Sequence, residues 1–274
     1  MGVAGKGEWS AGGADAVAAG HFTTLQLRGG RAQGRALPLL RLRQQSETLW
    51  GVGTHKARLL AAIRSGLRAA GGPSDATVRV CVRPVAPGDA RGAPEGDGPV
   101  FSPQGPGYPS LRVDVDVGPP RHVPAAPLRV RIHHGIRATP IVKHLALAPQ
   151  FDARAAAQDA GFDDALLVTT DGAVAEGTFW TLALWDGQTV TWPLAPALPG
   201  VTWRLLAGEL DAAGIPQQRV RVPIPALGRQ RAAWAVNSTG IRPIASVDGL
   251  AFAGDPTLGG RLQAMLDAVP WDPI

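Results

Sequence analysis

The chain has 274 residues, of which 45% are hydrophobic, and contains 35 glycines and 25 prolines. Apolar residues are spread along its whole length and no block of charge dominates, so the composition excludes wholesale disorder and a collagen-like repeat. The length suffices for one large or two modest domains with buried cores. A formal net charge of +5 does not indicate nucleic acid, because the arginines are scattered singly with few aromatic residues between them.

The cysteine content and the absence of long apolar segments bear on location. The single cysteine, Cys81, lies in the apolar run VRVCV and has no second cysteine with which to form an internal disulfide. The first twenty residues lack the apolar core of a signal peptide, and no later stretch approaches the roughly 18 apolar residues of a membrane span. We therefore expect a cytoplasmic protein that binds neither nucleic acid nor membranes.

The first half of the chain predicts strands with helices beside them. Residues 21–27 (HFTTLQL) are rich in strand formers and precede a Gly-Gly turn. Residues 54–70 carry apolar residues at helical spacing, and residues 77–85 alternate as a strand, as do LRVDVDV and LRVRIHH further on. Residues 87–109 form a Gly/Pro-rich loop. The pattern predicts a smaller α+β domain over residues 1–126, with antiparallel strands and helices to one side.

A second, larger domain is expected over residues 127–274. A helix is predicted at 151–160, followed by the strands DALLVTT, AVAEGTFWTLALW and TVTWP, which are separated by Asp-Gly turns at 171–172 and 186–187. Two successive hairpins predict an antiparallel sheet. The segment VTWRLLAGELDAAG reads as an amphipathic helix, and a short helix ends the chain.

The sequence contains few catalytic motifs. None of the six histidines has the spacing to carboxylates or cysteine that a metal site requires, and the glycine motifs of serine hydrolases and nucleotide-binding loops are absent. Only three lysines occur, Lys6, Lys56 and Lys143. Lys143 lies in apolar surroundings, where desolvation lowers the pKa of an amine as Schiff-base chemistry requires. On position alone, a chance lysine at the start of a helix remains the alternative.

Four segments follow Lys143 in a fixed order. They are Gly161-Phe162-Asp163-Asp164-Ala165-Leu166, Asp171-Gly172-Ala173-Val174-Ala175-Glu176-Gly177, Leu198-Pro199-Gly200-Val201-Thr202 and Asn237-Ser238-Thr239-Gly240. This order resembles the motifs of the class IV aminotransferases. These are pyridoxal 5′-phosphate enzymes of fold type IV, and they include branched-chain and D-amino-acid aminotransferases and aminodeoxychorismate lyase. The resemblance covers most of residues 140–250 and implies the two-domain α+β fold of these enzymes, with antiparallel sheets and flanking helices.

The N-terminal half also agrees with this family. Phe22-Thr23-Thr24-Leu25 and Leu39-Leu40-Arg41-Leu42 resemble the family's F-x-T-x-R-V and H-L-x-R-L motifs, with Pro38 in place of the histidine. In the family, the arginine of the second motif holds the cofactor phosphate. The resemblance places this role on Arg41, with Arg58 as the reserve candidate.

The resemblance also implies roles for the other matching residues. Lys143 would form the Schiff base and move a proton between Cα and C4′, and Glu176 would face the pyridine nitrogen. The backbone amides of Val201 and Thr202, at a helix start, would bind the phosphate together with hydroxyls of Thr202, Ser238 and Thr239. The alternatives are an exposed hairpin glutamate at 176, a simple helix cap at 202 and an ordinary turn at 237–239.

Three functions follow from the resemblance. The first is an aminotransferase that moves an amino group between an amino acid and a 2-oxo acid, and the second is a lyase of the aminodeoxychorismate type that releases pyruvate. The third is a divergent member that binds a small molecule or a partner subunit with little cofactor chemistry. The third is motivated by departures from the family pattern at Ala146, Leu147, Thr181 and Trp203, and by the position of the only tyrosine, Tyr108, in the Gly/Pro-rich loop. The family also implies a homodimer.

Overall fold

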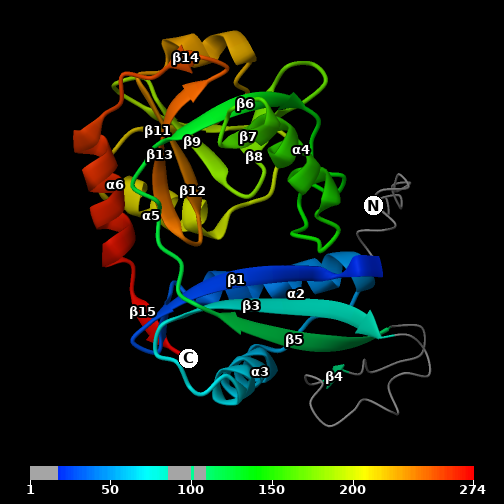
Figure 1. Cartoon of the computed structure of the whole chain (residues 1–274). Coiled ribbons are helices and arrows are strands. Elements are labelled where there is room, and N and C mark those ends of the chain that lie inside the picture. The colour runs from blue at the N-terminus through cyan, green and yellow to red at the C-terminus, as the bar shows by residue number, and fades with distance from the viewer. Residues whose placement is uncertain (1–17, 86–99, 102–108) are drawn as a thin grey trace, which may run out of the picture.

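The computed structural model describes residues 18–85, 100–101 and 109–274, and its strands form two sheets, one below the other in Figure 1. Tyr108 and most of the predicted Gly/Pro-rich loop lie outside the described residues. Within the described part of the chain, no helix has both the length and the apolar character needed to cross a bilayer.

The first sheet is antiparallel throughout, as predicted. Its strands run in the order β15-β2-β1-β3-β5-β4. The bounds are β1 His21–Arg28, β2 Arg31–Gln33, β3 Ala76–Val85, β4 Val100–Phe101, β5 Ser110–Gly118 and β15 Trp271–Pro273. β2 reaches only the C-terminal end of β1, at Leu27 and Arg28, so the edge of β1 near His21 stays open to another segment.

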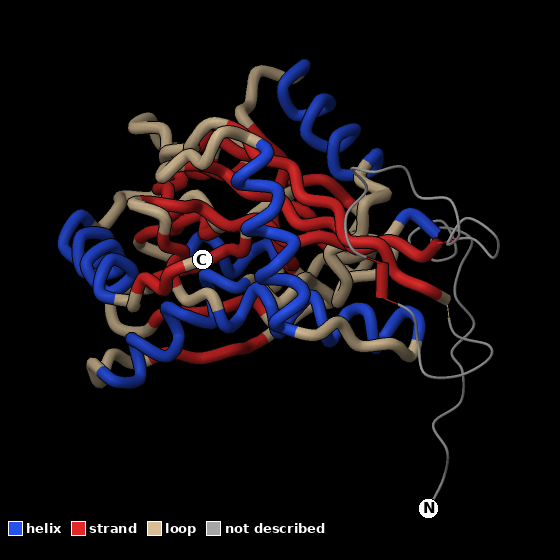
Figure 2. The backbone as a smooth tube through the Cα atoms, turned by 90° about the horizontal axis from the view of Figure 1, so that it is seen from below, coloured by secondary structure: helices blue, strands red, loops and turns tan. Residues whose placement is uncertain are grey.

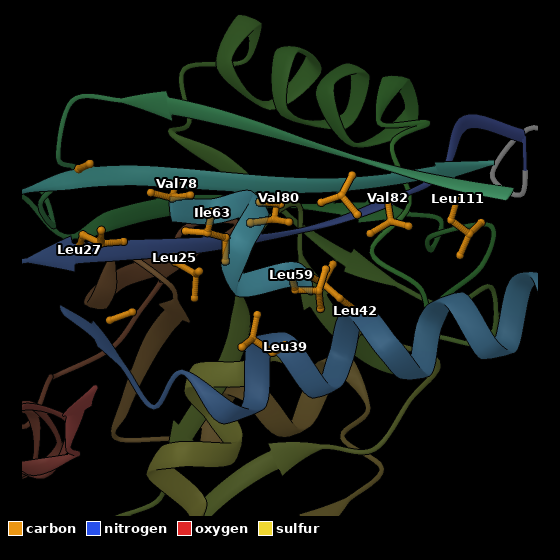
Figure 3. Close-up of a cluster of buried hydrophobic side chains, with 14 residues drawn as sticks. Leu25, Leu27, Leu39, Leu42, Leu59, Ile63, Val78, Val80, Val82 and Leu111 are labelled. Atoms are coloured by element: carbon orange, nitrogen blue, oxygen red, sulfur yellow. The ribbon is translucent and has the colours of Figure 1, made fainter. Parts of the chain in front are cut away.

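Helices α2 (Ala36–Trp50) and α3 (Lys56–Ala69) pack on one face of this sheet. Because side chains alternate along a strand, every second residue of β3 points into this core, and Figure 3 shows Val78, Val80 and Val82 meeting leucines of both helices. The residues between them, such as Arg79, lie on the opposite face. The core therefore fixes which residues of β1 and β3 face the second sheet.

The second sheet mixes parallel and antiparallel pairs, which corrects the expectation of a purely antiparallel one. Its order is β11-β10-β9-β12-β13-β6-β7-β8, with β14 beside β13. β6 is parallel to β7 and to β13, and β10 is parallel to β11. Helices explain two of these pairs, since parallel neighbours need a crossover: α4 (Ala148–Asp159) links β6 to β7, and α5 (Val201–Ala212) links β10 to β11. The strand bounds are β6 Leu128–His134, β7 Asp164–Val168, β8 Val174–Gly177, β9 Thr181–Trp185, β10 Val190–Pro193, β11 Gln217–Val220, β12 Ala232–Asn237, β13 Gly240–Val247 and β14 Leu250–Ala251.

The segment predicted as one strand from 173 to 185 is two strands, β8 and β9. The N–H of Gly177 donates to the carbonyl of Trp180 at 2.9 Å, so the chain turns between them. The indole of Trp180 lies where a Cβ on residue 177 would be, 1.9 Å from its nearest atom. Only glycine permits this approach, and the turn sends β8 and β9 to different positions in the sheet.

The C-terminal segment connects the two sheets. Helix α6 (Pro256–Ala268) packs beside α5 against β12 and β13, and the following β15 pairs with β2 of the first sheet. Figure 2 shows the helices on the outside of the strands. A 3-10 helix, Ile224–Arg229, completes the described elements. The division of the chain after residue 126 stays a prediction.

Candidate active site

The loop that carries Lys143 lies along the open edge of β1. The N–H of Phe22 donates to the carbonyl of Lys143 at 2.9 Å, and the N–H of Leu145 donates to the carbonyl of Gly20 at 2.8 Å. Figure 1 shows this loop below α4, above the N-terminal end of β1. Lys143 is therefore held by backbone hydrogen bonds to the first sheet, although it follows a strand of the second.

Gln45 of α2 fixes the same loop from the helix side. Its Nε2 donates to the carbonyl of Ile141 at 2.9 Å, and its Oε1 accepts from the N–H of Lys143 at 3.2 Å. Gln45 is buried, so both ends of its amide are used. The backbone on either side of Lys143 is therefore fixed by strand and helix together.

The Lys143 amine lies in a desolvated and electropositive environment. Its Nζ is 4.7 Å from the centroid of the Phe22 ring. Burial lowers the pKa of Lys143 to about 7, and the positive charges of Arg41 and Arg137 add to this effect, while Glu176 opposes it. A large share of this amine is therefore neutral near pH 7, as the sequence predicts for a nucleophilic lysine.

Glu176 is buried on β8, so the alternative of an exposed hairpin glutamate does not apply. Its Oε1 accepts from Nε of Arg137 at 3.3 Å, and the carboxylate also accepts from the N–H of Leu198. Burial raises the pKa of Glu176, and the Arg137 guanidinium works against this rise. The pair places a carboxylate with a fixed cationic partner near the Lys143 amine.

Sequence reasoning missed Arg137, which is 1% exposed. It donates through Nη2 to the carbonyl of Thr178 at 3.3 Å, and its Nη1 has no hydrogen-bond partner among the described residues. The available signal was an arginine six residues before Lys143, close to the apolar residues at 140–142. Nothing local to the sequence indicated that this residue is buried.

A second buried carboxylate supports the turn after Glu176. Asp164 accepts from Nη2 of Arg154 at 2.7 Å, from Nε1 of Trp180 at 2.9 Å and from Oγ1 of Thr178 at 2.6 Å. Thr178 is the residue whose carbonyl accepts from Arg137. The Asp164 of the G-F-D-D-A-L segment thus fixes the backbone that orients Arg137.

Arg41 lies on α2, half-buried against β1. Its Nη2 donates to Oγ1 of Thr23 at 2.6 Å, and its Nε has no partner among the described residues. Burial lowers the pKa of Arg41 to about 10, with contributions from the charges of Arg204 and Arg137. Arg58, the reserve candidate, lies on the exposed side of α3.

The start of α5 lies close to Glu176. Leu198, whose N–H reaches Glu176, is three residues before Val201, the first residue of α5, and Thr202 is buried. Gly200 caps this end, and a Cβ there would lie 2.4 Å from Oγ1 of Thr181. The free N–H groups of this helix end therefore face the region of the buried carboxylate.

The turn that contains Ser238 and Thr239 lies beside the same helix end. Thr181 pairs with Val236 across β9 and β12, which puts the turn after Asn237 near Gly200. The N–H of Thr239 donates to Oδ1 of Asn237 at 2.8 Å, and the Ser238 side chain is exposed. The structure thus brings Lys143, Arg41 and Glu176 together and places the helix start and this turn next to them.

A pocket of about 550 Å³ opens between α2 and the start of α5. Its size falls within the range of small-molecule sites. It is lined by Arg41, Gln44, Gln45, Glu47, Thr48, Ile141, Pro199 and Arg204. Elsewhere in the described residues, no cluster of three or more histidine, cysteine or acidic side chains is arranged to hold a metal ion.

The family model for amino-transferase class IV matches residues 20–247. This range contains every sequence-predicted site residue. The chain belongs to the class IV aminotransferase family. Pyridoxal 5′-phosphate is the cofactor of this family, in agreement with the prediction from sequence.

Solved structures with the same fold carry names from this class IV family. The chain is similar to 4-amino-4-deoxychorismate lyase from Pseudomonas aeruginosa, with 23% identity, a TM-score of 0.72 and coverage of 98% of this chain and 97% of that one. The PLP-bound form of a hypothetical aminotransferase from Mycobacterium tuberculosis has 22% identity and a TM-score of 0.71, with coverage of 97% of this chain and 94% of that one. The branched-chain amino acid aminotransferase of Escherichia coli has 17% sequence identity and a TM-score of 0.75, with coverage of 92% of this chain and 86% of that one. The search of curated proteins finds no significant match. The class IV fold is therefore confirmed.

Proposed function

We propose that this protein is a pyridoxal 5′-phosphate-dependent aminotransferase that moves an amino group between an amino acid and a 2-oxo acid, with Lys143 as its catalytic residue. One observation carries the proposal: an amine with its pKa lowered to about 7 lies against Phe22 and near the buried Glu176. Attack on an aldehyde requires a neutral amine. A protonated pyridine nitrogen requires a buried carboxylate partner.

The residues of the site fit this cofactor. The Nε of Arg41 and the Nη1 of Arg137 are buried without partners among the described residues. Arg41, Arg137 and Lys143 together outweigh the single carboxylate of Glu176, so a bound dianion would relieve their mutual repulsion. The phosphate contacts are assigned to Arg41, to the N–H groups of Val201 and Thr202, and to the hydroxyls of Thr202, Ser238 and Thr239.

The residues of the site would have different roles in this reaction. Bound pyridoxal 5′-phosphate supplies an electron-accepting ring that stabilises negative charge at the Cα of an attached amino acid. Lys143 Nζ would hold the cofactor covalently and, once released, would move the proton from Cα to C4′. Its lowered pKa suits both directions of this transfer near neutral pH. Arg137 favours the ionised form of Glu176, and the Phe22 ring lies beside the amine.

A lyase of the aminodeoxychorismate type is the second candidate. Phe22-Thr23-Thr24 and Val142-Lys143-His144-Leu145 favour the lyases, whereas Leu198-Pro199-Gly200-Val201-Thr202 favours the aminotransferases. Both reactions use the same lysine. A divergent member with little cofactor chemistry is the third candidate, and the homodimer stays a prediction.

The first experiment tests covalent cofactor binding. Purified protein incubated with pyridoxal 5′-phosphate should show an absorbance band near the visible edge, and borohydride should abolish the band and leave an adduct on the Lys143 peptide. Lys143→Ala should show neither, while Lys56→Ala, an exposed lysine on α3, should behave as wild type. If the wild type shows no band and no adduct, both enzyme proposals fail and the divergent member is favoured.

The second experiment separates the two enzymes. An aminotransferase loaded with cofactor and given only an amino donor should release at most one equivalent of 2-oxo acid per site and resume turnover when a 2-oxo acid acceptor is added. A lyase should release pyruvate continuously from aminodeoxychorismate with no acceptor. Continuous pyruvate release without amino transfer would contradict the leading proposal.

A further inference from the structure

Trp203, one of the departures from the family pattern, is followed directly by Arg204 in the first turn of α5. The Trp203 ring packs near Trp192, with ring centroids 6.1 Å apart, and the guanidinium carbon of Arg219 lies 4.9 Å from its centroid. Residue 203 is therefore committed to packing against β10 and β11.

Moving one residue along a helix turns the side chain by about 100°. Arg204 consequently leaves the α5 face that packs on β10 and lines the pocket between α5 and α2, together with Arg41. Side chains of a helix tilt toward its N-terminus, so Arg204, in the first turn of α5, leans toward the free N–H groups of Val201 and Thr202.

Positive charge in this pocket is not balanced by the acidic residue in its lining. Glu47 is paired with Arg43 of the same helix at 3.6 Å. No carboxylate of the described residues lies within ion-pair distance of Arg204. Among the described residues, the Thr23 hydroxyl is the one hydrogen-bond partner of the Arg41 guanidinium. Two arginines of different helices therefore line one pocket with hydrogen-bonding capacity to spare.

The pocket lies at one end of the candidate active site. Ile141 of its lining is two residues before Lys143, and Pro199 is adjacent to Leu198, whose N–H reaches Glu176. Lys143 and Glu176 themselves do not line it. The pocket thus adjoins the site on the side where Arg41 and the start of α5 meet, and it can hold an anionic group remote from the reacting amine.

We propose that Arg204 is a second ligand of the cofactor phosphate, which it binds from the outer side of the pocket while Arg41 binds it from the inner side. The inference rests on the proposed function for the identity of the ligand. Two guanidinium groups with charge-assisted hydrogen bonds to one phosphate increase both affinity and geometric selectivity.

The experiment compares ligands with and without a phosphate. Dissociation constants of pyridoxal 5′-phosphate, inorganic phosphate and pyridoxal are measured by calorimetry on cofactor-free wild type, Arg204→Gln, Arg204→Lys and Arg261→Gln. Arg261, exposed on the neighbouring helix α6, is the matched control for loss of one positive charge. Arg204→Gln should raise the Kd of both phosphate-bearing ligands roughly tenfold and leave pyridoxal unchanged, because only charge-assisted contacts to phosphate are lost. For Arg204→Lys, the Kd of both phosphate-bearing ligands should lie between the values for the wild type and for Arg204→Gln.

Two results would overturn the assignment. In the first, Arg204→Gln binds inorganic phosphate and pyridoxal 5′-phosphate as Arg261→Gln does. In the second, Arg204→Gln weakens the binding of pyridoxal as much as that of pyridoxal 5′-phosphate, which would indicate a general loss of structure. If the wild type fails to bind pyridoxal 5′-phosphate at Lys143, the proposed function fails, and the inorganic phosphate measurement alone then decides the role of Arg204.

Discussion

Lys143 and Phe22 contact each other through both backbone and side chain. The carbonyl of Lys143 accepts the N–H of Phe22 at 2.9 Å, and its amine lies 4.7 Å from the centroid of the Phe22 ring. The backbone bond fixes the lysine to the edge of β1, and the ring lies beside the amine. The contact with the first sheet therefore sets the position of the proposed catalytic group, while burial and the charges of Arg41 and Arg137 lower its pKa.

The reactivity of Lys143 should follow a titration near neutral pH. With its pKa at about 7, the amine is roughly 90% neutral at pH 8, whereas an ordinary lysine with a pKa near 10.4 is almost fully charged. Reductive methylation with peptide mapping should therefore modify Lys143 with a midpoint near pH 7. Arg41→Gln should move this midpoint upward, because Arg41 is the charge that contributes most to the lowered pKa.

Lys56, exposed at the start of α3, is the comparison within the same sample. The prediction is contradicted if Lys143 and Lys56 are modified with the same pH profile. It also fails if Arg41→Gln leaves the midpoint unchanged while circular dichroism shows an intact fold.

The Arg137–Glu176 pair should show strong energetic coupling. Arg137→Met leaves a buried carboxylate without its cation, which costs about 3–5 kcal/mol of unfolding free energy. Glu176→Gln in the same background removes the uncompensated charge, so the double variant should be more stable than the sum of the single losses predicts. Denaturant unfolding followed by tryptophan fluorescence measures the four members of this cycle.

The exposed pair Arg43–Glu47, 3.6 Å apart on α2, is the control for this cycle. Its coupling should stay below about 1 kcal/mol, because solvent screens exposed ion pairs. Equal coupling in the two cycles would show that burial does not strengthen the Arg137–Glu176 interaction.

The order of the motifs predicted those site residues that lie within a recognisable sequence motif. Lys143 and Glu176 were identified because their neighbours in the sequence form recognisable motifs, and the structure places both near one another. Arg41 was identified from a motif on a helix although its distance to Lys143 in the chain is large. Their convergence depends on the loop at 139–145 pairing with β1, an arrangement that the sequence does not encode in any nearby pattern.

Residues that act through burial were not predictable in this way. Arg137 belongs to no recognisable motif, and only the tertiary structure encloses it against Thr178 and Glu176. The break between β8 and β9 was missed because the apolar pattern continues through it, while the turn depends on the packing of Trp180 against Gly177. The mixed sheet was missed because hairpin turns indicate only the pairing of adjacent strands.

Alanine at position 177 should destabilise the protein strongly. Its Cβ would lie 1.9 Å from the Trp180 indole, whose Nε1 is fixed by a hydrogen bond to Asp164. Overpacking of this kind costs about 1–3 kcal/mol or more. Denaturant unfolding should show this loss for Gly177→Ala, and a smaller loss for the same change in a Trp180→Leu background, where the overlap is relieved.

Gly208 in α5 is the matched control, since no atom lies within 4 Å of a Cβ built there. Gly208→Ala should raise the free energy of unfolding by about 0.5–1 kcal/mol, because alanine favours the helix. A loss at 177 no greater than the change at 208 would contradict the account of the turn.

Two buried histidines should make the protein sensitive to mild acid. Burial, with a contribution from Arg41, lowers the pKa of His21 to about 3, and burial and Arg137 lower that of His144 to about 4. In the unfolded chain both titrate near 6.5. Between pH 6.5 and about 4 the unfolded state thus binds more protons, and the free energy of unfolding should fall by up to about 1.4 kcal/mol per pH unit for each histidine.

Glu176 acts in the opposite sense, because its raised pKa makes the folded state take up a proton first as the pH falls. The slope is therefore best assigned by substitution. Unfolding free energies measured at intervals from pH 7 to pH 4.5 should show a shallower slope for His21→Gln and for His144→Gln, by one proton each. His55→Gln, at the exposed N-cap of α3, is the matched control for the loss of one imidazole. If both buried-site variants retain the wild-type slope, the two histidines are protonated in the folded protein and the cause of acid sensitivity lies elsewhere.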